Sequence, residues 1–294
     1  MSNEPTGLAL YDRAAQDASA AVIAAYSTSF GLATRLLGPR PRPHVRNIYA
    51  LVRIADEIVD GPAAEAGMDA AAERAILDEL ELETLSAIQR GFSSNLVVHA
   101  FARTSRECGV GEELIRPFFA SMRTDLLTAR HDAASHDDYV YGSAEVVGLM
   151  CLQVFVNAGA PHPVSPDPQL VDGARRLGAA FQDVNFLRDL HHDEDALGRD
   201  YLGLASGGST RTQVLDRIDG DLGAAAAVIP KLPADCRRAV TAAHDLFAAL
   251  SLRLRRDSAS DVRVRVPDAV KATLAARAWL GFAPRPHRTV RARA

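Results

Sequence analysis

The chain has 294 residues, of which 48% are hydrophobic and 24% are charged, and its formal net charge is −4. This length supports a substantial core, as one large helical domain or two smaller ones, and the composition favours one globular unit without the basic excess of a nucleic-acid-binding protein. No apolar run reaches about 18 residues and the N-terminus lacks a signal-peptide pattern, so we expect a cytoplasmic protein, with peripheral membrane contact left open.

Apolar residues recur at intervals of three and four along the chain, which predicts a mostly helical protein of roughly eight to eleven helices. The breaks are rich in Gly and Pro and fall at 38–43, 61–62, 159–168, 206–209 and 230–233. The alternating run VRVRV at 262–266 is expected to be an extended connector that ends at Pro267, before a last helix through Trp279. We expect one domain over 1–283 and a disordered basic tail over 284–294, which could contact anionic lipid weakly.

The cysteines and several histidines offer a zinc site only weak support. Three thiols without CxxC spacing argue against both a disulfide framework and zinc, and favour reduced cysteines at Cys108, Cys151 and Cys236. The pairs His131-Asp132 and His136-Asp137 stand in a polar stretch, where we expect solvated turn residues.

A first polar constellation lies in the run NIYALVRIADEIVDG. Asp56 and Asp60 are one helical turn apart, so they share a helix face, and Arg53 extends that face. Arg53 with Glu57 also has the spacing of an ordinary surface ion pair. The apolar residues around them favour a functional stripe, because an arginine beside two carboxylates can fork onto phosphate oxygens that metal ions leave unneutralised.

A second constellation lies in FQDVNFLRDLHHDED. One helix face carries Gln182, Asn185, Asp189 and Asp193 at intervals of three or four. Arg188 is offset from that face and could brace a neighbouring helix or reach a phosphate. The adjacent His191 and His192 point in different directions and lack an HExxH pattern, which disfavours zinc.

Two such helices facing each other predict a metal site. Carboxylates buried side by side repel each other, and removing them from water costs several kcal/mol each unless a cation intervenes. Hard oxygen ligands suit Mg²⁺, which commonly completes its coordination with substrate phosphates, and Mn²⁺ is an alternative. The apolar faces of the helices would then hold a long hydrocarbon.

With these motifs in order, the chain resembles the squalene and phytoene synthase family. The resemblance is carried by YSTSFGLATRLL at 26–37, the Asp56 motif, DDYVYGSAEVVGLM at 137–150, QDVNFLRD and GRDYL, and it covers roughly residues 11–280. Within the family the chain is most similar to the phytoene synthases of actinobacterial carotenoid pathways.

The resemblance implies an all-α isoprenoid synthase fold, a single large helical bundle around a central cavity, which would be a monomer or a homodimer. It also implies Mg²⁺-dependent head-to-head condensation of two prenyl diphosphates, both geranylgeranyl diphosphate for a phytoene synthase. The product would form through a cyclopropyl diphosphate with release of diphosphate. No GxGxxG fingerprint is present, so no nucleotide cofactor is expected.

The family's functional residues can be carried over to matching positions. The resemblance implies metal ligands at Asp56, Glu57, Asp60, Asn185, Asp189 and Asp193, of which the four aspartates are also the catalytic residues. It implies substrate-binding residues at Ser27, Ser29, Arg53, Gln182, Asn185, Arg199 and Tyr201. Tyr49 and Tyr139 match catalytic tyrosines that line the chamber and could stabilise a carbocation, while Arg263 and Lys271 match a looser basic motif.

Three positions depart from the family pattern. Val59 replaces an acidic residue of some relatives, His192 replaces a frequent glutamate, and Glu145 replaces a frequent glycine. His192 could make one metal shell sensitive to pH, and Glu145 is expected to be a salt-bridge partner rather than a general base.

Two alternative functions stay open. One is squalene or dehydrosqualene synthesis from farnesyl diphosphate, because chain length depends on the depth of the cavity. The other is a non-catalytic lipid-binding or assembly relative, which the presence of all four aspartates disfavours.

Overall fold

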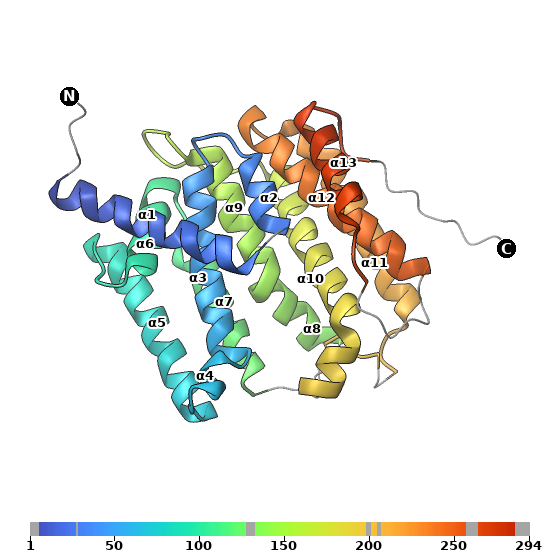
Figure 1. Cartoon of the computed structure of the whole chain (residues 1–294), viewed down its shortest axis with the longest axis horizontal. Coiled ribbons are helices and arrows are strands. Elements are labelled where there is room, and N and C mark those ends of the chain that lie inside the picture. The colour runs from blue at the N-terminus through green and yellow to red at the C-terminus, as the bar shows by residue number, and fades with distance from the viewer. Residues whose placement is uncertain are drawn as a thin grey trace.

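The computed structural model describes residues 6–27, 29–127, 133–197, 201–204, 207–256 and 264–285, with the backbone alone at 29–30, 133–134 and 191–197. These ranges contain helices and no strand (Figure 1). The α-helices are α1 (Gly7–Tyr26), α2 (Ser29–Arg35), α3 (Arg42–Val59), α4 (Pro62–Glu65), α5 (Ala70–Arg90), α6 (Leu96–Cys108), α7 (Glu112–Asp125), α8 (Ala133–Val140), α9 (Val146–Asn157), α10 (Pro168–Leu197), α11 (Arg211–Val228), α12 (Ala234–Arg256) and α13 (Asp268–Trp279). A π-helix, Tyr141–Glu145, joins α8 to α9, and a 3₁₀-helix, Ile229–Lys231, follows α11.

The described residues hold more helices than the sequence predicted. The surplus comes from short segments, since α2, α4 and α8 have 7, 4 and 8 residues. A repeat of three and four needs about 11 residues to become visible, so such segments are hidden in stretches that read as linkers. The expected connector before Pro267 is neither helix nor strand where it is described, at 264–266, and the last helix ends at Trp279 as predicted.

Local sequence explains several helix boundaries. The side chain of Asp69 accepts a hydrogen bond from the backbone N–H of Ala72 at the start of α5. Thr210 and Gln213 form a reciprocal capping box at the start of α11. Gly91 ends α5 with φ of +80°, a left-handed conformation that glycine adopts without strain. These caps satisfy backbone groups that a helix end leaves unpaired.

The helices enclose two apolar cores. The first lies among α3, α5, α6, α7 and α9, and its fully buried side chains include Phe101, Phe118 and Phe119. The second lies among α8, α10, α11 and α12 and takes in the segment 201–204 that follows α10. Each core holds enough large apolar side chains to stabilise its half of the molecule.

Backbone contact between small residues joins the two cores where α9 and the π-helix cross α10. A Cβ on Gly148 would lie 2.7 Å from the carbonyl oxygen of Ala174, and a Cβ on Gly178 would lie 2.6 Å from that of Ala144. No side chain fits at either point, so glycine is required for this close approach. The crossing brings the end of α8 against α10.

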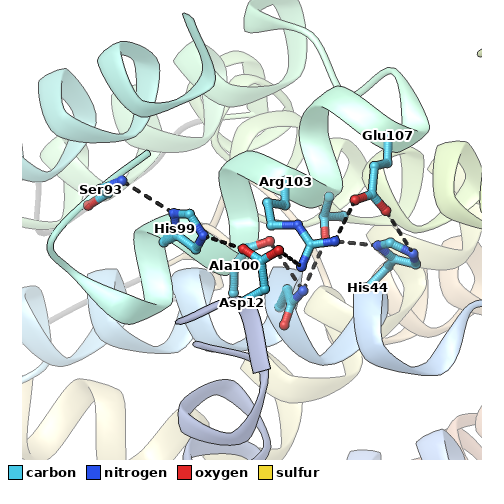
Figure 2. A network of polar contacts seen from close by, with 9 residues as sticks. Asp12, His44, Ser93, His99, Ala100, Arg103 and Glu107 are labelled. Carbon is cyan, nitrogen blue, oxygen red and sulfur yellow. Dashed lines mark hydrogen bonds and ion pairs between the residues drawn. The ribbon is translucent and has the colours of Figure 1, made fainter. Parts of the chain in front are cut away.

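A polar network ties α1 to α3 and α6 (Figure 2). The buried His99 lies 2.8 Å from Asp12, and its Nδ1 accepts from the backbone N–H of Ser93, so its Nε2 carries the proton shared with Asp12. Arg103 binds both Asp12 and Glu107, and Glu107 lies 3.7 Å from His44. The network compensates charged groups between three helices and fixes α1 on the first core.

One stretch of the described chain, Ser135–Asn157, is long and apolar enough to cross a membrane by length and composition. Half of its most apolar window is buried inside the protein, where it belongs to the two cores. A core helix passes the same test, so this stretch is weak evidence for a membrane span.

Candidate functional site

The first motif forms a polar stripe at the end of α3. Arg53 Nη1 donates to Glu57 Oε1 over 3.1 Å, and Arg53 Nη2 lies 3.9 Å from Asp56 Oδ2. The helix ends at Val59, and Asp60 follows as its C-cap. Arg53 therefore serves two carboxylates of the motif, and the expected ordinary ion pair with Glu57 coexists with the stripe.

The start of the YSTSFGLATRLL motif meets this stripe at the end of α1. The guanidinium of Arg53 stacks over the ring of Tyr26, 5.4 Å from its centroid. The next residue, Ser27, is the C-cap of α1 and is half-buried. The structure thus brings the predicted Ser27 and Arg53 to the same region, while the side chain of Ser29 lies outside the described residues.

Ionisation of the Asp56 side chain is unfavourable in the folded protein. Burial, together with the neighbouring carboxylates of Asp60 and Asp125, raises its pKa to about 8, although Arg53 opposes that change. Its side chain keeps 25% of its accessible surface, so it is within reach of a ligand. A carboxylate that is both accessible and crowded by like charge is suited to binding a cation.

Asp125 contacts two of the predicted site residues and was not itself predicted from the sequence. It ends α7, is buried, and accepts hydrogen bonds from the hydroxyls of Tyr139 and Tyr201, each over 2.9 Å. Burial and the charges of Asp125 and Asp56 hold the pKa of Tyr139 well above its usual value, so this hydroxyl stays protonated. The two predicted tyrosines are therefore joined through one carboxylate. A single aspartate at a helix end belongs to no motif, so no local signal marks it.

The second motif helix reaches the same place through Phe186. The ring of Phe186 stacks on Tyr201 at 4.3 Å between centroids and lies 6.0 Å from Tyr139. Phe186 follows Asn185 on α10, so the aromatic cluster of Phe186, Tyr139 and Tyr201 connects α10 with Asp125. The charge of Asp125 acts in turn on Asp56. The structure therefore links parts of the two motifs that are far apart in sequence.

The other predicted residues of α10 are described in part. Gln182 and Asn185 are half-buried, and Asp189 pairs with its neighbour Arg188 at 2.6 Å. Arg188 thus pairs with a carboxylate of its own motif. The side chain of Asp193 and that of His192 lie outside the described residues, as do Arg199 and Arg263. The pKa of Arg53 is raised despite burial, mainly by the charge of Asp56, and hydrogen bonds with Glu57 and the half-buried Tyr49 act in the same direction.

Three further expectations can be compared with the structure. Glu145 pairs with Arg175 at 2.6 Å, which confirms the salt-bridge interpretation. Lys271 pairs with Asp268 at 3.1 Å beside an apolar recess between α12 and α13. The three cysteines are free, as predicted, and burial raises the pKa of Cys108 and Cys151 to about 12.

The interpretation of His136 as a solvated linker residue is wrong. His136 lies in α8 and is 5% exposed. The polar residues around it do not mark a loop, because Asp183 and Arg217 compensate the imidazole inside the fold. The expectation for His131-Asp132 falls outside the described residues.

The donor set on α3 fits a hard divalent cation. Within the described ranges, no three His, Cys, Asp or Glu side chains form a preassembled metal cluster. Mg²⁺ does not need one, since it usually takes one or two carboxylates and completes its shell with water and substrate phosphates. Burial, with the neighbouring carboxylates, raises the pKa of Asp56, and a bound cation would stabilise its ionised form.

Comparison with known proteins identifies the family. The family model described as squalene/phytoene synthase matches residues 23–205, well over half of the chain. This chain belongs to the squalene/phytoene synthase family. Members of the family are prenyltransferase-type enzymes that act on prenyl diphosphates and depend in general on divalent metal ions.

Similar family members are phytoene synthases by name. A 15-cis-phytoene synthase of Paracoccus sp. is 28% identical over 264 residues, which cover 82% of both chains. The 15-cis-phytoene synthase of Synechocystis sp. is 34% identical over 188 residues, which cover 62% of this chain and 54% of that protein. The chloroplastic phytoene synthase 1 of Solanum lycopersicum is 32% identical over 65% of this chain, which spans only 43% of that longer protein.

Solved structures confirm the isoprenoid synthase fold. A dehydrosqualene synthase matches 92% of this chain and 96% of its own with a TM-score of 0.75 at 21% identity. The squalene synthase HpnC of Alicyclobacillus acidocaldarius matches 84% and 95%, with a TM-score of 0.70 at 20% identity. These likenesses establish the all-α fold that the sequence predicted.

Proposed function

We propose that this family member is a phytoene synthase, which condenses two molecules of geranylgeranyl diphosphate head to head and releases diphosphate. The reaction would pass through a cyclopropyl diphosphate and end with loss of a proton. The observation that carries the proposal is the connection of the α3 stripe, through Asp125, to the hydroxyls of Tyr139 and Tyr201. The names of the similar sequences support geranylgeranyl diphosphate as the substrate.

In this proposal the α3 stripe holds the diphosphate groups. Asp56 and Asp60 on one helix, and Asp189, Asp193 and Asn185 on the other, would hold the divalent ions, with Glu57 beside the first pair. Bound Mg²⁺, or Mn²⁺ in its place, supplies Lewis-acid stabilisation of the departing diphosphate. Arg53 would fork onto the remaining phosphate oxygens, with Ser27, Ser29, Gln182 and Arg199 as further polar contacts.

The aromatic cluster would serve the carbocation. Tyr139, Tyr201 and Phe186 present π faces whose quadrupole attracts positive charge, and Tyr49 would add another. Because both hydroxyls donate to Asp125, their oxygens are held away from a reactive cation. The buried surroundings exclude the water that would quench such an intermediate.

Incubation of the purified protein with Mg²⁺ and either geranylgeranyl or farnesyl diphosphate tests the proposal. We expect diphosphate release and a C40 hydrocarbon from the C20 substrate without any added nucleotide. A C30 product formed preferentially from farnesyl diphosphate would replace phytoene synthesis with squalene or dehydrosqualene synthesis. Failure to release diphosphate from either substrate would favour a non-catalytic lipid-binding relative.

A further inference from the structure

A buried polar cluster lies next to the aromatic cluster of Tyr139, Phe186 and Tyr201, and none of its residues was predicted as a site residue. It contains one residue from each of three helices, namely His136 of α8, Asp183 of α10 and Arg217 of α11. His136 Nε2 lies 3.1 Å from Asp183 Oδ1 and 3.1 Å from Arg217 Nη2. Arg217 also donates to Asp183 Oδ2 over 2.9 Å. The side chains of His136 and Asp183 are only 6% and 2% exposed, so the cluster is built into the fold.

The other nitrogen of the imidazole points at the segment that carries Tyr201. His136 Nδ1 lies 2.7 Å from the backbone carbonyl oxygen of Tyr201. A carbonyl oxygen only accepts, so Nδ1 must carry the proton of this hydrogen bond. A guanidinium N–H only donates, so Nε2 accepts from Arg217 Nη2, and Arg217 is itself held by Asp183 Oδ2. These contacts fix the plane of the ring and therefore the direction of the Nδ1 donor.

Tyr201 is consequently held at three separate points. Its carbonyl is bound by His136, its hydroxyl donates to Asp125 over 2.9 Å, and its ring stacks on Phe186 with planes 9° apart. The hydroxyl and ring contacts act on the side chain, whereas the carbonyl contact acts on the backbone of Tyr201. His136 therefore contributes to the position of the backbone itself.

We propose that His136 is a positioning residue for the reaction, acting through the carbonyl of Tyr201. It sets the position of the Tyr201 ring against Phe186 and places the Tyr201 hydroxyl within hydrogen-bond distance of Asp125. Asp183 and Arg217 orient His136 and do not touch the site themselves. This inference rests on the proposed function only for its kinetic consequence, because the hydrogen bond it assigns is a property of the free protein.

Solvent reaches the cluster through a pocket. This pocket, of about 400 Å³, is lined by His136, Asp183 and Arg217 together with residues of α8, the π-helix and α10. Arg217 is 40% exposed there, whereas the imidazole is buried beneath it. The pocket therefore gives small solutes a route to the position of the guanidinium, which an experiment can exploit.

Two isosteric substitutions separate the two nitrogens of His136. In His136→Asn the amide nitrogen takes the place of Nδ1 and can still donate to the carbonyl of Tyr201. In His136→Gln the amide takes the place of Nε2 and its oxygen can still accept from Arg217, so the contact with Arg217 survives and the contact with Tyr201 is lost. We expect kcat for diphosphate release to fall about 10- to 100-fold in His136→Gln with little change in KM, and to stay within about 3-fold of the wild type in His136→Asn.

Hydrogen exchange of the free proteins gives a readout without substrate. We expect backbone amides at 201–204 to exchange faster in His136→Gln than in His136→Asn or the wild type. A purely structural role would make the two variants equally damaged in kcat and in melting temperature, and that outcome would overturn the proposal. If the wild type has no synthase activity, the proposed function fails, while the exchange result still decides whether His136 holds Tyr201.

Arg217→Ala provides a second variant in case substitutions at His136 prevent folding. We expect it to lower kcat, and guanidinium ion at a non-denaturing concentration to restore part of the activity by entering the pocket. An equal response of the wild type to guanidinium, or no recovery in a folded Arg217→Ala protein, would contradict the role of Arg217 in orienting His136.

Discussion

Asp125 accepts the hydroxyl protons of Tyr139 and Tyr201 on its two separate oxygens, each over 2.9 Å. In Asp125→Asn one of those acceptors becomes an amide donor, so one tyrosine hydroxyl must accept instead of donate and its proton turns away from residue 125. We expect kcat for diphosphate release to fall about 10- to 100-fold while the protein stays folded. The exposed Asp78→Asn is a matched control that removes the same charge elsewhere. Equal activity in both variants would show that Asp125 has no part in the site.

Asp56→Asn should separate activity from stability. The amide is a poor ligand for Mg²⁺, so activity should fall by about 100-fold or more, as for loss of a metal ligand.

The metal-free Asp56→Asn protein should gain stability at the same time. The pKa of Asp56 is raised to about 8, so ionisation opposes folding. This destabilisation is absent below pH about 4, grows as the pH rises and is complete above about 8. At pH 8 we expect a gain of about 1–3 kcal/mol in the free energy of unfolding, measured by urea denaturation with EDTA. A loss of stability would mean that the carboxylate is already compensated.

His44 should make stability depend on pH. Burial lowers its pKa, with a smaller contribution from Arg103, although Glu107 acts in the opposite direction. A lowered folded-state pKa means that the unfolded chain binds the proton more readily, so stability is present above pH 6.5 and is lost as the pH falls through and below that value.

The matched variant for this prediction is His44→Asn, which keeps a polar group at the Nδ1 position near Thr104 and does not titrate. Its free energy of unfolding should decline less than that of the wild type between pH 7.5 and 5.5. Parallel pH profiles would assign the decline to other groups.

The crossing of α10 against the π-helix should tolerate no added atom. Gly178→Ala places a methyl group 2.6 Å from the backbone carbonyl of Ala144, and we expect a loss of about 1–3 kcal/mol in the free energy of unfolding. Gly220→Ala on α11 is the control, because a Cβ there meets nothing within 4 Å and alanine favours the helix by about 0.5–1 kcal/mol. Denaturant titration of the two variants should therefore give changes of opposite sign.

The sequence predicted what depends on local spacing. Asp56 and Arg53 share a helix face because one turn of helix places them there, and Glu145 found a salt-bridge partner as helix carboxylates often do. The helical fold class followed from the same periodicity.

What the sequence did not predict depends on contacts between distant segments. Asp125 is 14 residues from one tyrosine partner and 76 from the other, and no spacing rule relates them. His136 looked like a linker residue because the partners that compensate it, Asp183 and Arg217, lie on other helices. Buried polar groups are interpretable only once their hydrogen-bond partners are known.

The helix crossing at Gly148 and Gly178 also limits which substitutions could change the hydrocarbon length that this protein accepts. With no side chain between Gly178 and the carbonyl of Ala144 or between Gly148 and that of Ala174, this contact has no rotamer to exchange and no methyl group to remove. A variant that accepts a longer or shorter hydrocarbon cannot obtain the volume here by a single substitution. Selection for a new chain length would have to act on walls where side chains, rather than backbones, meet.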